Sequence, residues 1–264
     1  MDPVIVERGD GPLVLGFPHT GTHVPEAVRA RLNARGRQLT DTDWRIEDLY
    51  GGLAPGATVV RATVHRYVVD ANRDPSGASL YPGQSTTDLV PLTDFEGEPI
   101  WTDPPTEAEV AERTAAFHAP YHAALRAEME RVRDRHGVAI LWDAHSIRSR
   151  LPFLFDGLLP DLNIGTNSGA SCDPGLERAV ADLAADSGFT HVANGRFKGG
   201  WTTRHYGQPG AGWHAIQMEI AQSAYLVEEA PPWTCSDQKA QRLRPVLGAM
   251  LRTLADLAPS LRRP

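Results

Sequence analysis

The sequence is poor in the features that mark disulfide-rich and membrane proteins. Its 264 residues include two cysteines, Cys172 and Cys235, which are too few for a disulfide framework and lack the CxxC spacing of a thiolate metal site. We expect both thiols to be free. No stretch approaches the roughly 18 consecutive apolar residues of a membrane span, and the first residues lack the basic and then apolar order of a secretory signal. These absences predict a soluble, cytoplasmic protein without a membrane partner.

Clusters of positive charge are missing as well. The chain carries 26 Lys and Arg against 33 Asp and Glu, a formal net charge of −7, and has no long run of Lys or Arg. Nucleic-acid-binding domains typically show a basic patch, so we do not expect nucleic acid as the main partner. The sequence also lacks GxGxxG after a strand, the Walker A pattern, HExxH and GxSxG. The usual signatures of nucleotide binding, of one metallopeptidase class and of serine hydrolases are therefore absent.

Short apolar runs alternate with amphipathic segments along the chain. Strands are predicted at 12–17, 138–142 and 214–220, with one or two more in the Val- and Thr-rich stretch 57–70. Helices are predicted at 25–35, 41–53, 106–136, 174–186 and 237–257. Pro120 is expected to kink or divide the third of these helices. This alternation predicts an α/β fold, a three-layer sandwich around a mixed, mostly parallel sheet. No repeat or linker divides the chain, so we expect one domain over 1–264.

Two long segments read as loops with a binding role. Residues 76–104 are rich in Gly, Pro, Ser, Thr and Asp, and a loop of that length in a compact domain is usually a lid or a binding element. Residues 195–210 place Lys198, Arg204 and His205 between glycines. This pattern suggests a flexible basic loop suited to closing over an anion.

Two histidines follow predicted strands, where open α/β sheets place their ligand sites. His19 comes after the first apolar run and His145 after the central one. Two imidazoles and one carboxylate, with a position left for water, are a common ligand set of catalytic zinc. The carboxylate is expected from the helix predicted over 41–53, in which Asp43 and Glu47 lie one turn apart.

Other residues offer competing sites. His19 and His23 have i, i+4 spacing but are interrupted by Gly21, so His23 is either a substrate contact or a bystander. His118 and His122 have the same spacing on a predicted helix, without an acidic partner in register. Cys172 lies among glycines as a conceivable nucleophile, but no triad partner can be assigned to it.

One carboxylate and three arginines complete the set of candidates. Glu219 interrupts the apolar strand predicted at 214–220, which is costly unless the carboxylate is paired or functional. Two interpretations are open for Glu219: a salt-bridged residue at a strand edge, or a general base beside a metal ion. Arg66, Arg73 and Arg204 lie in polar loops and could bind anionic substrate groups through their planar guanidinium forks, with Arg73 the best placed.

At these residues the sequence resembles the N-formylglutamate amidohydrolase family, also called N-formylglutamate deformylases. The resemblance spans nearly the whole chain, and an ordered set of segments is more specific than any single motif. The segments are PHTGTHVP (18–25), DTDWRIEDLY (41–50), HRYVVDANRDP (65–75), LWDAHSIRS (141–149), PDLNIGTNSGASCDP (160–174), GRFKGGWTTRHYGQP (195–209) and HAIQMEIAQSAYL (214–226).

That family is distantly similar to zinc carboxypeptidases and aspartoacylases, which implies a fold like theirs and a His/acidic/His zinc site. His19 and His145 match the two imidazole ligands, and Glu219 matches the catalytic base. The sequence departs from those relatives at position 22, where Thr replaces the acidic ligand. Asp43 is our choice for that ligand, because amidohydrolases of the formylglutamate type are similar in keeping an Asp here. Glu47 is the fallback.

The resemblance also implies a substrate and a reaction. Asn72 and Arg73 are similar to the Asn-Arg pair that binds the substrate carboxylate in aspartoacylases, Arg66 to the arginine that polarises the scissile carbonyl, and Arg204 is a further candidate for an anionic group. The expected reaction is metal-dependent hydrolysis of N-formyl-L-glutamate to L-glutamate and formate, a step of histidine degradation. A metallo-amidase for another N-acyl amino acid or peptide is the alternative within this class. A non-catalytic anion-binding protein is the alternative outside it. The expected partner is a small acidic substrate, and the expected state is a monomer or small homo-oligomer.

Overall fold

The computed structural model describes residues 1–78 and 87–261, which surround one seven-stranded sheet. Its strands are β1 (Val4–Glu7), β2 (Leu13–Phe17), β3 (Thr58–Ala62), β4 (Ala139–Ile147), β5 (Leu162–Gly165), β6 (His191–Ala193) and β7 (Trp213–Ala221). They are ordered β1-β3-β2-β4-β7-β5-β6. The pairs β1–β3 and β5–β7 are antiparallel, and the other four are parallel. The predicted mixed, mostly parallel sheet is confirmed.

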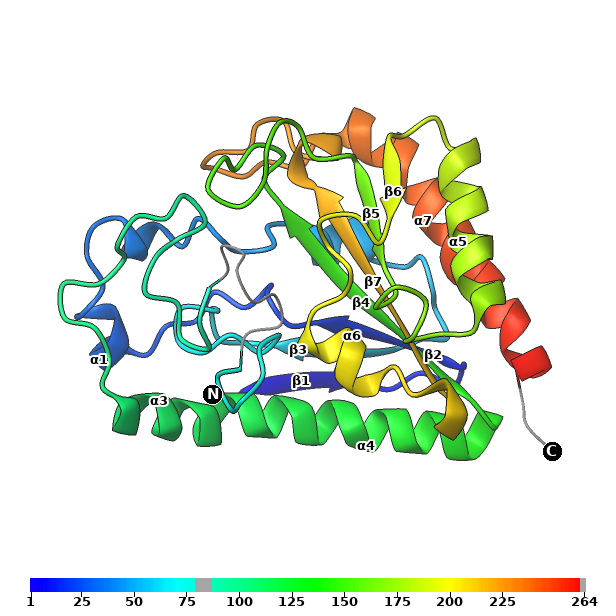
Figure 1. The fold of residues 1–264 in the computed structure, drawn as a ribbon, viewed down its shortest axis with the longest axis horizontal. Helices are drawn as coiled ribbons and strands as arrows, with labels where there is room; N and C mark the ends of the chain where they lie inside the picture. The colour runs from blue at the N-terminus through cyan, green and yellow to red at the C-terminus, as the bar shows by residue number, and fades with distance from the viewer. Residues whose placement is uncertain (79–86, 262–264) are drawn as a thin grey trace.

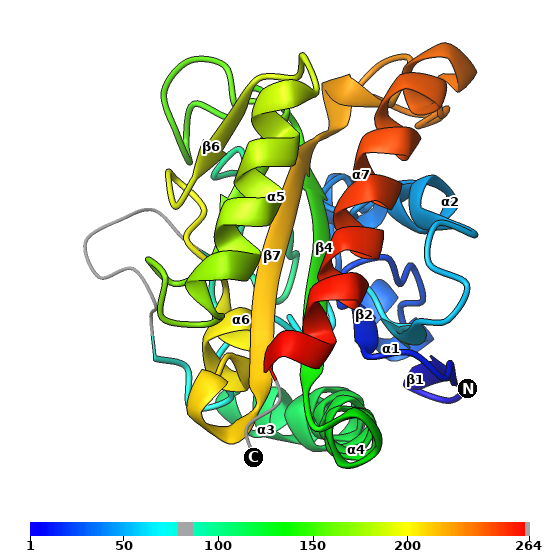
Figure 2. The ribbon, with the colours of Figure 1, turned by 90° about the vertical axis from the view of Figure 1, so that its right-hand side faces the viewer.

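Helices cover both faces of this sheet. They are α1 (Glu26–Arg29), α2 (Ile46–Tyr50), α3 (Glu107–Arg113), α4 (Ala119–His136), α5 (Pro174–Asp186), α6 (Trp201–Tyr206) and α7 (Asp237–Leu257). Single 3-10 turns lie at Gly36–Gln38, Pro209–Ala211, Gln222–Ala224 and Ala258–Leu261. Helices α3 and α4 run along one face, and α5 and α7 lie side by side on the other (Figures 1 and 2). The predicted three-layer α/β architecture is therefore confirmed.

Apolar side chains of the central strands point alternately to the two faces of the sheet and fill the space between the sheet and the helices on each face. In β4, Leu141 packs toward α4 while its neighbour Trp142 packs toward α5 and α7, because successive strand residues point to opposite faces. All of β2, β4 and β7 is buried. Strands covered on both faces have continuous apolar runs, which is why these three could be predicted from the sequence. Among the described helices, none is long and apolar enough to cross a membrane.

Several local predictions near the site were wrong. The helix predicted over 41–53 is shortened to α2, because Arg45 has a left-handed backbone (φ 62°) that no helix interior allows. Asp43 therefore lies in the turn before the helix and not on its face. The helix predicted over 25–35 is reduced to the single turn α1. The Val- and Thr-rich stretch 57–70 contains one strand, β3, in agreement with the prediction of one or two, and the chain from Thr63 to Asp70 is irregular.

Other elements are longer or shorter than predicted. Strand β4 continues to Ile147, so His145 lies within the strand and not beyond its end. The segment 195–210 is not entirely loop, since it contains α6. A π-helical turn, Thr114–His118, divides the predicted helix 106–136 just before Pro120. That proline then falls in the first turn of α4, where its missing N–H costs little. Of the predicted loop 76–104, residues 79–86 lie outside the described part, and no helix or strand forms in the remainder.

Candidate active site

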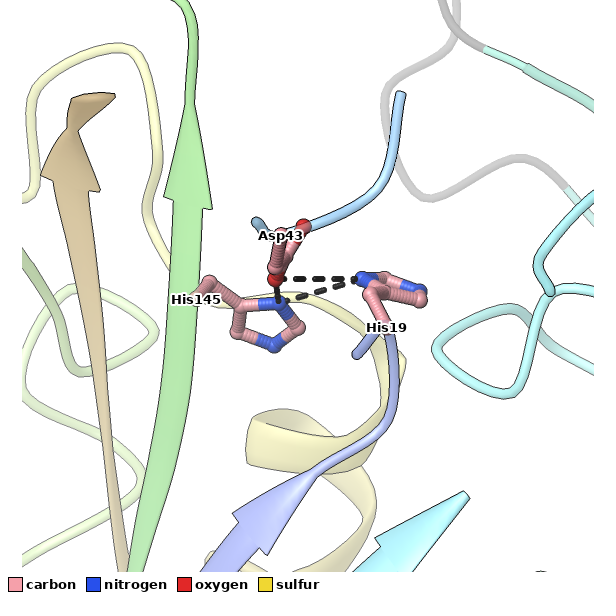
Figure 3. A group of neighbouring side chains, drawn as sticks. All are labelled: His19, Asp43 and His145. Carbon is pink, nitrogen blue, oxygen red and sulfur yellow. Dashed lines mark hydrogen bonds and ion pairs between the residues drawn. The ribbon is translucent and has the colours of Figure 1, made fainter. Parts of the chain in front are cut away.

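His19, Asp43 and His145 meet at the carboxyl ends of the central strands. The Nδ1 atoms of the two histidines are 3.1 Å apart, and Asp43 Oδ2 lies 3.1 Å from His145 Nδ1 and 3.8 Å from His19 Nδ1 (Figure 3). All three side chains are buried. Ligands about 2.0–2.1 Å from a tetrahedral zinc ion lie roughly 3.3 Å from one another. The donor atoms and their spacing thus fit a divalent metal ion.

The backbone fixes the three side chains in this arrangement. His19 follows β2 after Pro18, and its carbonyl oxygen accepts a hydrogen bond from the Asp43 N–H at 3.0 Å. The Ser146 N–H, next to His145 on β4, donates to Asp43 Oδ2 at 3.2 Å. The turn before α2 is therefore tied to both strands, and this is how residues far apart in sequence converge on one point.

Each histidine has a second carboxylate behind its ring, which sequence reasoning missed. His19 Nε2 lies 2.6 Å from Asp70 Oδ1, and His145 Nε2 lies 3.0 Å from Asp143 Oδ1. A proton on Nε2 leaves Nδ1 as the lone-pair donor that faces the centre of the group. Asp143 could have been recognised from the sequence, because it precedes His145 by two residues in a strand and residues i and i+2 of a strand share a face. Asp70 gave no comparable signal, because the chain around it is irregular.

Charges around the group shift the pKa values of the two histidines in opposite directions in the metal-free protein. Burial, helped by Arg66, lowers the pKa of His19 to about 4. Burial also acts to lower the pKa of His145, but the carboxylates of Asp143 and Asp43 outweigh it and hold that pKa well above its ordinary value. Burial opposes ionisation of Asp43, but Arg66 and His145 keep its pKa below normal. In the absence of a metal ion, the carboxylates of Asp143 and Asp43 thus favour a protonated His145, whereas burial favours a neutral His19.

Arg66 is part of this centre. Its guanidinium donates to Asp43 Oδ1 at 3.1 Å, lies 4.9 Å from the centre of the Phe95 ring, and lines the adjoining pocket. The side chain is only 5% exposed. A buried guanidinium beside the histidines can bind an oxygen that gains negative charge during a reaction.

Glu219 lies beside the histidines on the next strand. It is the register partner of His145 in the parallel pair β4–β7, and it lines the same pocket. Its Oε2 accepts a hydrogen bond from Gln217 Nε2 at 3.0 Å. Burial raises the pKa of Glu219 to about 7. A carboxylate with such a pKa can accept and return a proton near neutral pH.

The Asn72–Arg73 turn forms another wall of the pocket. Asn72 Nδ2 lies 3.1 Å from His145 Nε2, and its Oδ1 accepts from the Thr202 N–H at 2.8 Å. Arg73 donates from Nε to the Thr87 carbonyl oxygen at 2.9 Å and from Nη2 to Thr87 Oγ1 at 2.8 Å. Both residues line the pocket. The predicted pair is thus placed next to the histidines.

The next arginine that lines the pocket is not Arg204, the candidate that the sequence suggested. Arg204 donates to the carbonyl oxygen of Gly199 at 2.9 Å and is not among the described residues that line the pocket. Arg196, from the same loop segment, does line it. The sequence holds no pattern that separates these two arginines, since both lie in the glycine-rich stretch.

The competing candidates lie elsewhere. Glu47 pairs with Arg61 on β3 and is absent from the cluster. His118 and His122 donate through Nε2 to the carbonyl oxygens of Arg73 and Ala71, at 3.0 and 2.7 Å. They are therefore hydrogen-bonded to the Asn72–Arg73 turn. Neither belongs to a potential metal group in the described part of the chain, nor does His23. His205 stacks on Trp201 and does not line the pocket.

Cys172 does not have the properties of a nucleophile. Its thiol is buried, and burial raises its pKa to about 12, so the reactive thiolate is not populated near neutral pH. Cys172 and Cys235 are both free, as expected.

Together these features define an α/β protein with a candidate metal centre at the carboxyl ends of its parallel strands, beside a pocket lined by guanidinium groups. The chain belongs to the N-formylglutamate amidohydrolase family, whose sequence model matches residues 11–226. It is 46% identical over 259 residues to N-formylglutamate deformylases from Pseudomonas putida and Pseudomonas aeruginosa. The matches cover 96% of this chain and 96% or 97% of those proteins.

A solved structure shares the fold over the full length. The crystal structure of an N-formylglutamate amidohydrolase from Ralstonia eutropha JMP134 superposes with a TM-score of 0.81 at 27% identity, covering 98% of this chain and 99% of that one. The family resemblance expected from the sequence segments is therefore confirmed.

Proposed function

We propose that this protein hydrolyses N-formyl-L-glutamate to L-glutamate and formate, as a soluble cytoplasmic enzyme of histidine degradation. The observation that carries the proposal is the convergence of His19, Asp43 and His145 beside Glu219 in an arginine-lined pocket. The names of the relatives, N-formylglutamate deformylases at 46% identity, support the choice of substrate. The proposal includes a single catalytic domain over 1–264 and a monomeric or small homo-oligomeric state.

A divalent ion, zinc by our proposal, is held by His19, Asp43 and His145. Two nitrogen donors and one carboxylate favour zinc over magnesium or calcium, which prefer oxygen ligands. When bound, the ion supplies a Lewis acid for the formyl oxygen and lowers the pKa of a coordinated water. Asp70 and Asp143 orient the rings from behind, as outer carboxylates do in many zinc sites.

Glu219 is the proton carrier in this proposal. It accepts a proton from the water that attacks the formyl carbon and delivers it to the glutamate nitrogen as the C–N bond breaks. Its burial and its pKa of about 7 suit both directions of transfer. Arg66 donates to the formyl oxygen, which gains negative charge as the tetrahedral intermediate forms.

Asn72 and Arg73 bind the α-carboxylate of the substrate. They lie next to His145, so a carboxylate on the carbon that bears the formyl-amide nitrogen can reach them while the formyl group faces the histidines. Arg204 is the sequence-based candidate for the second carboxylate, and it is not among the described residues that line the pocket. Recognition of the glutamate half explains how so small a formyl group can be selected.

The test measures release of the free amino acid from N-formyl-L-glutamate, N-formyl-L-methionine and N-acetyl-L-glutamate by the full-length protein. We expect turnover of the first substrate to exceed that of the other two, and His145→Ala to abolish it. Faster turnover of another N-acyl amino acid would establish the alternative amidase. Binding of N-formylglutamate without any turnover in the metal-loaded protein would leave an anion-binding role.

A further inference from the structure

A third guanidinium lines the pocket in addition to those of Arg66 and Arg73. Arg196 comes from the loop between β6 and α6. Strand β6 is at one edge of the sheet, whereas Arg66 and Arg73 follow β3, which lies near the other edge. It is half-buried, and its Nε donates to the carbonyl oxygen of Leu154 at 2.9 Å. This hydrogen bond holds the Arg196 side chain against Leu154, which also lines the pocket.

The other two arginines lie at the end of the pocket where His19, Asp43 and His145 meet. Arg66 is bound to Asp43, one of the candidate ligands. Arg73 is fixed by Thr87 and follows Asn72, which contacts His145. Since N-formylglutamate carries two carboxylates in addition to its formyl oxygen, these two arginines account for the formyl oxygen and the nearer carboxylate. The distal carboxylate needs a further cation.

An apolar wall connects the two ends. Arg66 lies over the ring of Phe95, and Arg196 lies 5.5 Å from the centre of the Phe197 ring. Both rings pack in one apolar cluster with Ile147 and Leu154, and all four of these apolar residues line the pocket. An apolar surface between two guanidinium groups matches a glutamate side chain, which has two methylene groups before its terminal carboxylate.

We propose that Arg196 binds the γ-carboxylate of the substrate and makes the enzyme selective for an acidic side chain. This inference rests on the proposed function and adds the residue that sets its side-chain specificity. The guanidinium offers the planar fork that a carboxylate accepts in bidentate fashion. The methylene groups of the substrate lie along the Phe95–Ile147–Leu154–Phe197 surface.

The test compares N-formyl-L-glutamate with N-formyl-L-glutamine, which has the same length but a neutral end. Arg196→Gln is expected to lower kcat/KM for the acidic substrate roughly 10- to 100-fold, the effect of removing a hydrogen bond to a charged group. For the neutral substrate, kcat/KM should change by less than about threefold, because the lost interaction was absent there. Arg196→Lys should recover part of the selectivity through its charge without the bidentate geometry.

Two matched variants complete the experiment. Arg178→Gln, at an exposed position on α5, should leave both substrates unchanged. Arg204→Gln should leave the ratio of the two kcat/KM values unchanged, and a selective loss in this variant would assign the subsite to Arg204 and overturn our proposal. Equal losses for both substrates in Arg196→Gln would also overturn it, since they indicate a structural role. If the wild-type protein turns over neither substrate, the proposed function itself fails and this assignment fails with it.

Discussion

Glu219 on β7 lies directly beside His145 on β4, as its register partner in a parallel strand pair. The register of these two strands runs unbroken from Ala139 and Trp213 to Ile147 and Ala221. A shift of one residue would move either side chain to the other face of the sheet. The proposed proton carrier and the proposed metal ligand are therefore positioned by two strands that are buried throughout, and not by a loop.

Replacing Glu219 separates proton transfer from metal binding. Glu219→Gln keeps the size and hydrogen-bonding capacity of the side chain but cannot accept the proton. We expect kcat for N-formyl-L-glutamate to fall roughly 100- to 10,000-fold, with metal content unchanged. Steady-state formate assays and metal analysis measure the two quantities. Glu112→Gln, at an exposed position of α3, is the control. A near-normal kcat in Glu219→Gln would assign the base to another residue.

The choice of acidic ligand is tested by a pair of variants. Asp43→Asn removes the carboxylate that faces both histidines, and we expect metal affinity to fall by more than the roughly 10- to 100-fold that outer carboxylates contribute. Glu47→Gln removes only the pair with Arg61 and should retain the affinity. Competition with a chromophoric chelator measures both. The opposite ranking would make Glu47 the ligand.

The sequence was sufficient for the central strands and for two of the three proposed metal ligands, for a physical reason. Strands β2, β4 and β7 are buried on both faces, so they are continuous apolar runs with a polar residue near the end. The edge strands β1 and β6 were missed because they are short, with half-buried and exposed residues in alternation. Asp43 was chosen correctly as a member of the cluster but on the wrong element, since the left-handed backbone at Arg45 leaves no pattern in the sequence.

His122 should act on substrate binding through the turn it contacts. Its Nε2 donates to the carbonyl oxygen of Ala71, directly before Asn72. We expect His122→Phe to raise KM for N-formyl-L-glutamate more than it lowers kcat. His122→Gln, which retains an N–H donor, should restore KM. If both variants lose activity with unchanged KM, the contact is only structural.

His122 is also expected to make the stability of the protein depend on pH. Burial, with a contribution from His118, lowers the pKa of His122 to about 3, against about 6.5 in the unfolded chain. The unfolded state therefore binds the proton more readily, and stability present above pH 6.5 is lost as pH falls toward 3. The loss has a slope of up to about 1.4 kcal/mol per pH unit.

Urea unfolding of the wild-type protein and of His122→Gln, both with the metal removed, checks this between pH 7.5 and 5. The wild-type protein should lose more unfolding free energy over that range, because the variant lacks the titrating imidazole. Parallel curves for the two proteins would show that His122 does not carry the effect.

The rest of the site depends on contacts that local patterns do not encode. Arg196 and Arg204 lie in one glycine-rich segment, and only the fold brings the first into the pocket lining. His118 and His122 have the spacing of a metal pair on a helix, but their partners are carbonyl oxygens of a distant turn. Asp70 meets His19 because the irregular chain after β3 passes close to the end of β2. Such tertiary pairings become visible only when the chain is folded.

Stoichiometric metal reconstitution tests the central claim most directly. The full-length protein is stripped with a chelator and titrated with Zn²⁺ while formate release from N-formyl-L-glutamate is followed. We expect no turnover in the stripped protein and a linear rise that ends at about one ion per chain, with no recovery in His145→Ala. Full turnover by the stripped protein, or equal recovery in His145→Ala, would contradict the account.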